Sequence, residues 1–174
     1  MADSKLYFAY GSNINLDQMA CRCPAAKVVG PVTLEGWELL FRGNNAGHGV
    51  ATIAPKEGCT VHGLLWQISP QCEWSLDRYE GYPTLYDKAP VKVKNAQDQE
   101  ITVMAYVMTE RYQFPSMPSQ FYYGGIEEGY RQNGLPVGEL KKAWDHSVRE
   151  VHEATERINA SASRPPRRKD SYER

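Results

Sequence analysis

The residues best suited to chemistry in this sequence are Glu80 and the loop Gly11-Ser12-Asn13. Glu80 stands at the expected end of a helix, among tyrosines and just before a turn with glycine and proline. The negative end of the helix dipole and an aromatic environment both favour the protonated carboxyl, so this position predicts a raised pKa. Such a group can act as a general acid and base near neutral pH. The alternative is a surface glutamate at a helix end.

The loop follows a strand-like stretch, Leu6-Tyr7-Phe8-Ala9-Tyr10, and precedes a helix start expected at Asn15. A strand that turns sharply into a helix leaves backbone N–H groups unpaired, and these suit a carboxylate or a developing oxyanion. Gly11 can adopt a positive φ and lets another group approach the main chain closely. An ordinary tight turn between a strand and a helix is the alternative.

Other kinds of active site have little support in the sequence. The four histidines are dispersed, and none forms a metal-ligand motif, so we expect no metal. No serine or cysteine stands in an activated arrangement. Cysteines are too few and too scattered for a disulfide framework or a zinc site, which predicts reduced thiols at Cys21, Cys23, Cys59 and Cys72.

The composition is that of a soluble globular protein. The chain has 174 residues, a net charge of −1 and 24% charged residues, without the excess of positive charge that nucleic-acid binding favours. No apolar run approaches the ~20 residues of a membrane span, and the N-terminus lacks the apolar segment of a signal peptide. We therefore expect a cytoplasmic protein with no nucleic-acid or membrane partner. Its oligomeric state stays open.

Extended segments and a few helices must position these residues. The patterns predict strands over residues 27–34, 37–41, 50–54, 60–68, 88–94 and 100–108, with a turn at 55–58 and a hairpin at 95–99. Helices are expected over 15–22 and from Pro70 to about Glu80, where Gly81 ends the helix. Two terminal helices follow, one carrying Tyr122, Ile126 and Tyr130, the other Leu140, Trp144, Val148 and Val151. The fold class is α+β, with a mainly antiparallel, curved sheet.

The chain is expected to form one domain over residues 1–159. Residues 160–174 lack apolar periodicity, which predicts a flexible C-terminal tail. The tail has five basic and two acidic residues, a balance that suits RNA or membrane contact. A solvated terminus is the preferred interpretation, since nothing else in the sequence supports either partner.

Several segments in register resemble one family, the γ-glutamylcyclotransferases. They occur in the order Phe8-Ala9-Tyr10-Gly11-Ser12-Asn13, Val50-Ala51-Thr52-Ile53, Val61-His62-Gly63-Leu64-Leu65-Trp66, Leu76-Asp77 with Glu80-Gly81, and Asn133-Gly134-Leu135-Pro136. The resemblance spans Leu6 to Pro136, most of the chain. It implies a small, closed or nearly closed β-barrel flanked by helices, and no cofactor.

The resemblance also implies a reaction, in which a γ-glutamyl amide cyclises to 5-oxoproline and releases its amine. The residue matching the family's proton shuttle is Glu80. The expected substrate-binding residues are Tyr7, Tyr10, Gly11, Ser12, Asn13, Tyr86 and Tyr122. The match of Tyr86 is looser than the others, because spacing from the glutamate varies in this region.

Asn13 favours a dipeptide-type substrate, since relatives acting on γ-glutamylamines or glutathione tend to carry another residue there. A different γ-glutamyl amine, a biosynthetic intermediate or a non-catalytic binding module are the alternatives, and the intact Glu80 argues against the last. The amine side would face loops 43–49 and 114–118, whose sequences do not identify it.

Overall fold

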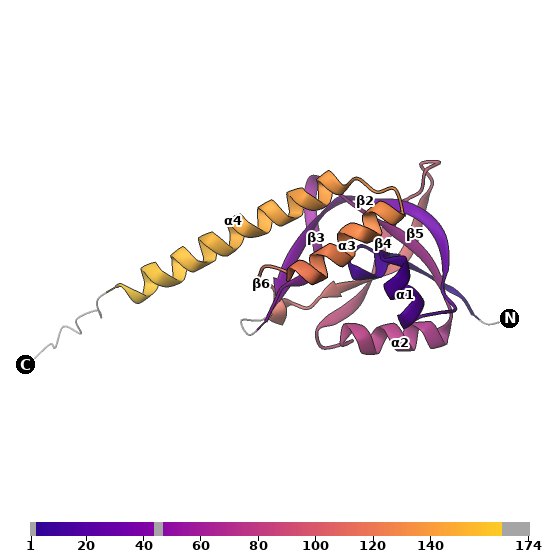
Figure 1. The fold of residues 1–174 in the computed structure, drawn as a ribbon, viewed down its shortest axis with the longest axis horizontal. Helices are drawn as coiled ribbons and strands as arrows, with labels where there is room; N and C mark the ends of the chain where they lie inside the picture. The colour runs from indigo at the N-terminus through magenta and orange to yellow at the C-terminus, as the bar shows by residue number, and fades with distance from the viewer. Residues whose placement is uncertain (1–2, 44–46, 165–174) are drawn as a thin grey trace, which may run out of the picture.

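Five strands close into a small barrel in the computed structural model, which describes residues 3–43 and 47–164. They are β1 (Lys5–Ala9), β2 (Lys27–Gly43), β3 (Val50–Ile68), β4 (Tyr86–Lys94) and β5 (Glu100–Met108). The order is β3-β1-β5-β4-β2, and β2 pairs with β3 to close the ring (Figure 1). Only β1 and β5 are parallel, so the expected α+β class and mainly antiparallel closed barrel are confirmed.

Helices flank the barrel where the sequence places capping residues. They are α1 (Leu16–Arg22), α2 (Pro70–Glu80), α3 (Gln120–Gln132) and α4 (Val137–Ala162), with 3-10 turns η1 (Ser12–Ile14) and η2 (Glu110–Tyr112). The side chains of Asn15, Ser69 and Ser119 accept hydrogen bonds from backbone N–H groups in the first turns of α1, α2 and α3. Gly81 ends α2 in the left-handed conformation, with φ of 64°, as its position predicts.

The longest strands differ from the expected pattern. Segments 27–34 and 37–41 form one strand, β2, and the turn expected at 55–58 is wrong because β3 continues through it. Glu35 pairs with Thr60 and Trp37 with Pro55, so residues 56–59 bulge opposite Gly36. A bulge bends a strand without ending it. A short strand, β6 (Phe114–Pro115), also pairs with the end of β2, where a loop was expected.

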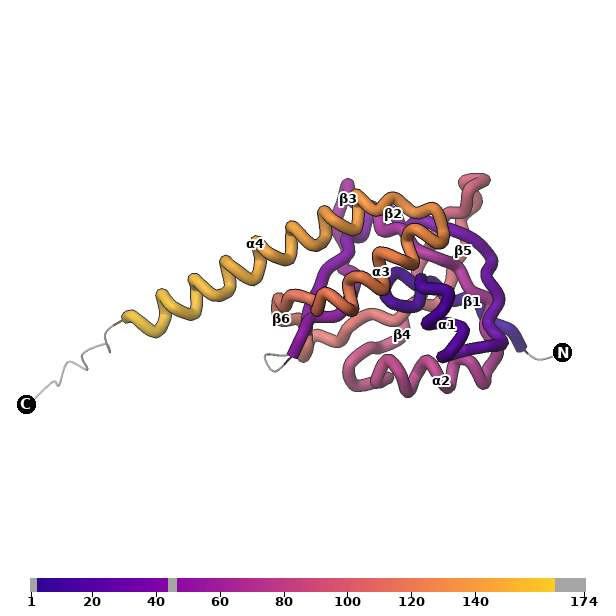
Figure 2. Tube along the Cα trace, in the orientation of Figure 1, coloured from indigo at the N-terminus to yellow at the C-terminus, as the bar shows by residue number. Residues whose placement is uncertain are grey.

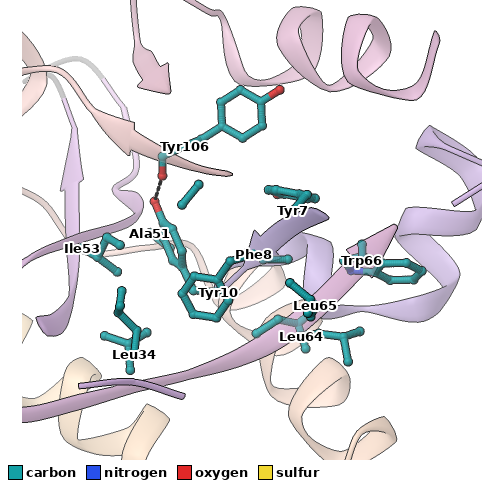
Figure 3. Packing of buried hydrophobic residues seen from close by; sticks show 14 of the residues in the cluster. Tyr7, Phe8, Tyr10, Leu34, Ala51, Ile53, Leu64, Leu65, Trp66 and Tyr106 are labelled. Carbon is teal, nitrogen blue, oxygen red and sulfur yellow. Dashed lines mark hydrogen bonds between the residues drawn. The ribbon is translucent and has the colours of Figure 1, made fainter. Parts of the chain in front are cut away.

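The core explains why the first strand is apolar without alternation. Tyr7, Phe8, Ala9 and Tyr10 are all buried, because β1 is covered on both of its faces. Figure 3 shows Phe8 and Tyr10 packed with residues of β2 and β3. Fully burying one such aromatic side chain stabilises the fold by about 1.5–3 kcal/mol. The core therefore fixes where β1 ends, and with it the position of the loop that follows.

The length of α2 brings Glu80 beside that loop. The antiparallel pairing sets Lys5, at the start of β1, opposite Ile68, and α2 begins two residues later. Lys5 donates to Glu73 of α2 at 2.8 Å, so β1 and α2 start near each other. A helix of 11 residues and a strand of 5 residues each extend roughly 16 Å. The end of α2 therefore reaches the end of β1.

Helix α3 packs over η1 and holds the loop from the other side. Asn133 donates its side-chain amide to the Ile14 carbonyl at 3.0 Å, and Asn15 donates to the Gly125 carbonyl at 2.9 Å. A Cβ at Gly129 would stand 2.7 Å from the backbone nitrogen of Asn15. The approach between α3 and the loop thus requires glycine at this position, and it explains a glycine inside a helix.

Helix α4 begins against the barrel and then extends away from it (Figures 1 and 2). Of the expected apolar stripe, Leu140 is fully buried whereas Val148 is 47% exposed. The neighbouring Ser147 is buried and Glu150 accepts from Arg42 of β2, so this part of α4 still lies on the barrel and Val148 faces away from it. The helix continues past Asn159 to Ala162. Residues 165–174 of the expected tail lie outside the described residues.

Candidate active site

A cavity of about 180 Å³ opens between the loop after β1 and the end of α2. It brings together every site residue expected from the sequence, namely Tyr7, Tyr10, Gly11, Ser12, Asn13, Glu80, Tyr86 and Tyr122. Sequence reasoning missed the remaining lining residues, Val50, Ala51, Tyr79, Leu85 and Tyr106. Val50, Leu85 and Tyr79 are partly or largely exposed, so they stand at the mouth of the cavity.

Glu80 is the carboxylate of the cavity and is partly buried. Burial raises its pKa to about 7, against the opposing effect of the nearby Arg22 charge. The raised pKa agrees with the expectation from its position. A carboxyl that titrates near neutral pH can take up a proton and return it within one reaction.

Asn13 connects Glu80 to the rest of the site. Its side-chain amide donates to Glu80 Oε1 at 3.3 Å and to the hydroxyl of Tyr7 at 3.0 Å. Its side-chain oxygen accepts from Arg22 at 2.7 Å, and its backbone carbonyl accepts from Trp66 Nε1 at 3.0 Å. Because both ends of the residue are held, Asn13 is a rigid part of the cavity wall.

The turn at Gly11 has a different conformation from the one the sequence suggests. Its φ is −113°, so the positive φ that glycine permits is not used. The missing side chain of Gly11 instead lets Ala51 and Tyr122 approach the main chain, since a Cβ at Gly11 would stand 3.1 Å from Ala51 Cβ and 3.5 Å from the Tyr122 hydroxyl. The N–H groups of Gly11, Ser12 and Asn13 lie at the start of η1, where no preceding turn supplies acceptors.

The tyrosine hydroxyls are ordered by main-chain groups. Tyr86 donates to the Ala51 carbonyl at 2.5 Å, and Tyr122 accepts from the Ala51 N–H at 3.0 Å. Tyr10 donates to the Tyr106 carbonyl (Figure 3). Burial raises the pKa of these three phenols and that of the Tyr106 phenol above the ordinary range, so all four remain neutral hydrogen-bonding groups.

Two neighbours of Glu80 in the sequence differ from expectation. Asp77, which its place on the same helix would suggest to be a solvated surface residue, accepts from the Tyr106 hydroxyl at 2.5 Å and from Lys88 at 3.0 Å. Tyr82 is 39% exposed and lies against Lys88, away from the cavity. The missed Tyr106 offers no local signal, because an aromatic residue within a strand usually belongs to a core.

All four cysteines are free thiols, as their spacing predicts. Within residues 3–43 and 47–164, no group of three or more His, Cys, Asp or Glu side chains is arranged to hold a metal ion. The expectation that the protein needs no metal stays a prediction. None of the helices in these ranges is long and apolar enough to cross a membrane.

Comparison with known proteins gives consistent matches. The model of the family described as "Gamma-glutamyl cyclotransferase, AIG2-like" matches residues 7–131. Gamma-glutamylcyclotransferase of Bos taurus is 35% identical over 148 residues, covering 80% of this chain and 77% of that protein. The Homo sapiens protein of that name is 36% identical over 143 residues, covering 78% and 74%. A solved structure titled "Gamma-glutamyl cyclotransferase" superimposes with a TM-score of 0.74 at 32% identity, covering 81% of this chain and 86% of that one.

Proposed function

Because this chain belongs to the gamma-glutamyl cyclotransferase, AIG2-like family, we propose that it cyclises a γ-glutamyl amide to 5-oxoproline and releases the free amine. The observation that carries the proposal is Glu80, a carboxyl with a pKa of about 7 inside a cavity walled by tyrosines and by the loop after β1. The substrate supplies its own nucleophile, the α-amine. No serine, cysteine, metal or cofactor is needed for this chemistry.

The first step is removal of a proton from the α-ammonium of the substrate, whose reference pKa is about 8. Glu80 is the base, since its pKa of about 7 lies close to that of the ammonium. The freed nitrogen then attacks the side-chain carbonyl carbon and forms the C–N bond of the five-membered ring. The cavity holds the flexible glutamyl chain folded for this attack, which supplies a large part of the rate.

Negative charge develops on the carbonyl oxygen during the attack. The N–H groups at the start of η1 stabilise it or bind the substrate's carboxylate, because they are fixed before the reaction begins. Glu80, now protonated, donates its proton to the departing nitrogen as the original amide bond breaks. The ring nitrogen gives up a second proton as the lactam forms, and the released amine takes it up. Two protons in total move from the ammonium to the leaving amine, and no water is consumed.

The amine side of the substrate faces the mouth of the cavity. Val50 and Leu85 are there, and Val50 adjoins loop 43–49, of which residues 44–46 lie outside the described residues. Asn13 supports a γ-glutamyl dipeptide as the substrate class. We place the enzyme in the cytoplasm, acting on small molecules without a nucleic-acid or membrane partner.

Assay of 5-oxoproline release tests the function directly. The purified protein should form 5-oxoproline from γ-glutamyl dipeptides faster than from γ-glutamylamines or glutathione. Release from glutathione alone would assign a different substrate, and tight binding without release from any compound would make the protein a binding module. A chain with no release and no binding would refute the proposal.

The pH dependence of kcat/KM should identify the base. Glu80 acts only when ionised, so kcat/KM should rise with pH through an apparent pKa of about 7. It should fall again as the free substrate ammonium loses its proton near pH ~8. At pH 5 it should be roughly a few per cent of its maximum or less. A flat profile between pH 5 and 7 would show that another group takes the proton.

A further inference from the structure

Arg22 lies directly behind the wall of the cavity without being part of its lining. It ends α1, and its guanidinium donates to Asn13 Oδ1 at 2.7 Å and to the Ser12 hydroxyl at 3.3 Å. Its other terminal nitrogen donates to Gln18 at 2.8 Å, and its plane lies 3.8 Å from the centre of the Tyr79 ring. Four contacts in different directions hold this side chain in one orientation.

The contact with Asn13 decides which way the Asn13 amide points. A guanidinium can only donate hydrogen bonds, so Asn13 must present its oxygen to Arg22. Its NH₂ group must then face the opposite side, where Glu80 Oε1 and the Tyr7 hydroxyl accept from it. With the amide reversed, an oxygen would face the carboxylate of Glu80. Arg22 therefore sets the hydrogen bond that Glu80 receives.

The charge of Arg22 acts on Glu80 in the same direction. Arg22 lowers the pKa of Glu80, while desolvation raises it. The hydrogen bond from Asn13 also favours the carboxylate form. Among the described residues, Glu80 also interacts with neutral phenols from β1, the loop after it, β4, β5 and α3, namely Tyr7, Tyr10, Tyr86, Tyr106 and Tyr122, and Tyr79 of α2 lines the same cavity.

We propose that Arg22 is a positioning residue for the proposed reaction, which fixes the Asn13 amide and keeps Glu80 available as a carboxylate base. Without Arg22, burial alone would hold Glu80 protonated to higher pH and leave less base at neutral pH. The inference rests on the proposed function for its kinetic consequence. The proton affinity of Glu80 can be measured without any substrate.

Two substitutions separate the donor-only charge of Arg22 from its planar shape. Arg22→Gln removes the charge and, because a glutamine amide can donate or accept, no longer forces Asn13 to present its oxygen. Arg22→Lys keeps a charged group that only donates and loses the planar fork. The carboxyl ¹³C signal of Glu80, assigned by its absence in Glu80→Gln, reports the titration in the free protein. In Arg22→Gln this titration should move to higher pH. In Arg22→Lys it should stay near that of the wild type.

The same loss of charge should change the pH profile of kcat/KM on its acidic side, where the rate rises as Glu80 ionises. For Arg22→Gln, kcat/KM at pH 6 should fall about tenfold and approach the wild type above pH 8, since charge removal alters the fraction of ionised base. Arg22→Lys should lower kcat/KM at every pH without moving this rise. Arg78→Gln is the matched control, because Arg78 stacks on Trp74 at 4.9 Å and does not line the cavity.

An unchanged Glu80 titration in Arg22→Gln would overturn the proposal. An upward shift in Arg22→Lys as large as that in Arg22→Gln would overturn the role of charge. A wild-type protein that forms no 5-oxoproline would refute the proposed function, yet the titration would still decide the role of Arg22. The two failures are therefore distinguishable.

Discussion

Glu80→Gln should reduce 5-oxoproline formation by roughly 10²–10⁴-fold at saturating substrate, the usual range for loss of a positioned acid–base group. Glutamine keeps the size of the side chain and can still contact the Asn13 amide, which donates to Oε1 of Glu80 at 3.3 Å. It cannot accept the ammonium proton or return it to the leaving amine. Folding and binding of the γ-glutamyl group should therefore persist while turnover is lost.

Glu80→Asp tests position separately from charge. The shorter side chain withdraws the carboxylate from the amine, and a displacement of about 1 Å can cost 10²-fold in rate. Glu128→Gln on α3 is the matched control, since Glu128 is exposed and removing a surface carboxylate changes stability by less than about 0.5 kcal/mol. Near-normal turnover in Glu80→Gln would eliminate Glu80 as the shuttle and this cavity as the active site.

Gly11→Val should raise KM by roughly ten- to hundredfold, because overpacking of this size costs about 1–3 kcal/mol. A Cβ at this position would stand 3.1 Å from Ala51 Cβ, and the two added methyl groups must occupy the cavity or displace its wall. The wall includes the Tyr122 hydroxyl, 3.5 Å from the same point. Gly11→Ala should show the same effect in smaller degree.

The control for this series is Gly124→Val. Gly124 lies in α3, as Tyr122 does, and a Cβ there has no neighbour within 4 Å. Thermal unfolding measured beside KM distinguishes a lost site from a lost fold. Substrate binding by Gly11→Val with the wild-type KM would show that the loop after β1 is a structural turn only.

Many element boundaries depend on capping and turn residues that act locally, so they can be predicted from the sequence. The boundaries of α2 follow from Ser69, Pro70 and Gly81, which act within one turn of the helix ends. The hairpin of β4 and β5 follows from its turn residues in the same way. The apolar stretch at β1 indicates a buried strand without specifying its partners, and only the resemblance implied a closed barrel.

Long-range contacts explain what the sequence could not supply. Glycine at position 36 suggests a break, yet cross-strand pairing on either side carries β2 and β3 through the bulge. Tyr106 reaches the site through a contact with Tyr10, which is far away in the sequence, and Arg22 lies behind the loop and donates to Asn13. Neither residue stands in a recognisable motif. The expected site residues were found because the loop and Glu80 lie at element ends, where local signals are strongest.

The neutral tyrosines around Glu80 also provide an optical measure of the site. Phenolate absorbs at longer ultraviolet wavelengths than phenol, and an unburied tyrosine ionises near pH 10. Burial raises the pKa of Tyr7, Tyr10, Tyr86, Tyr106 and Tyr122, so these rings stay spectrally silent in alkali that ionises exposed ones. Alkaline difference absorbance can thus report, without substrate or label, whether a variant has kept these tyrosines buried.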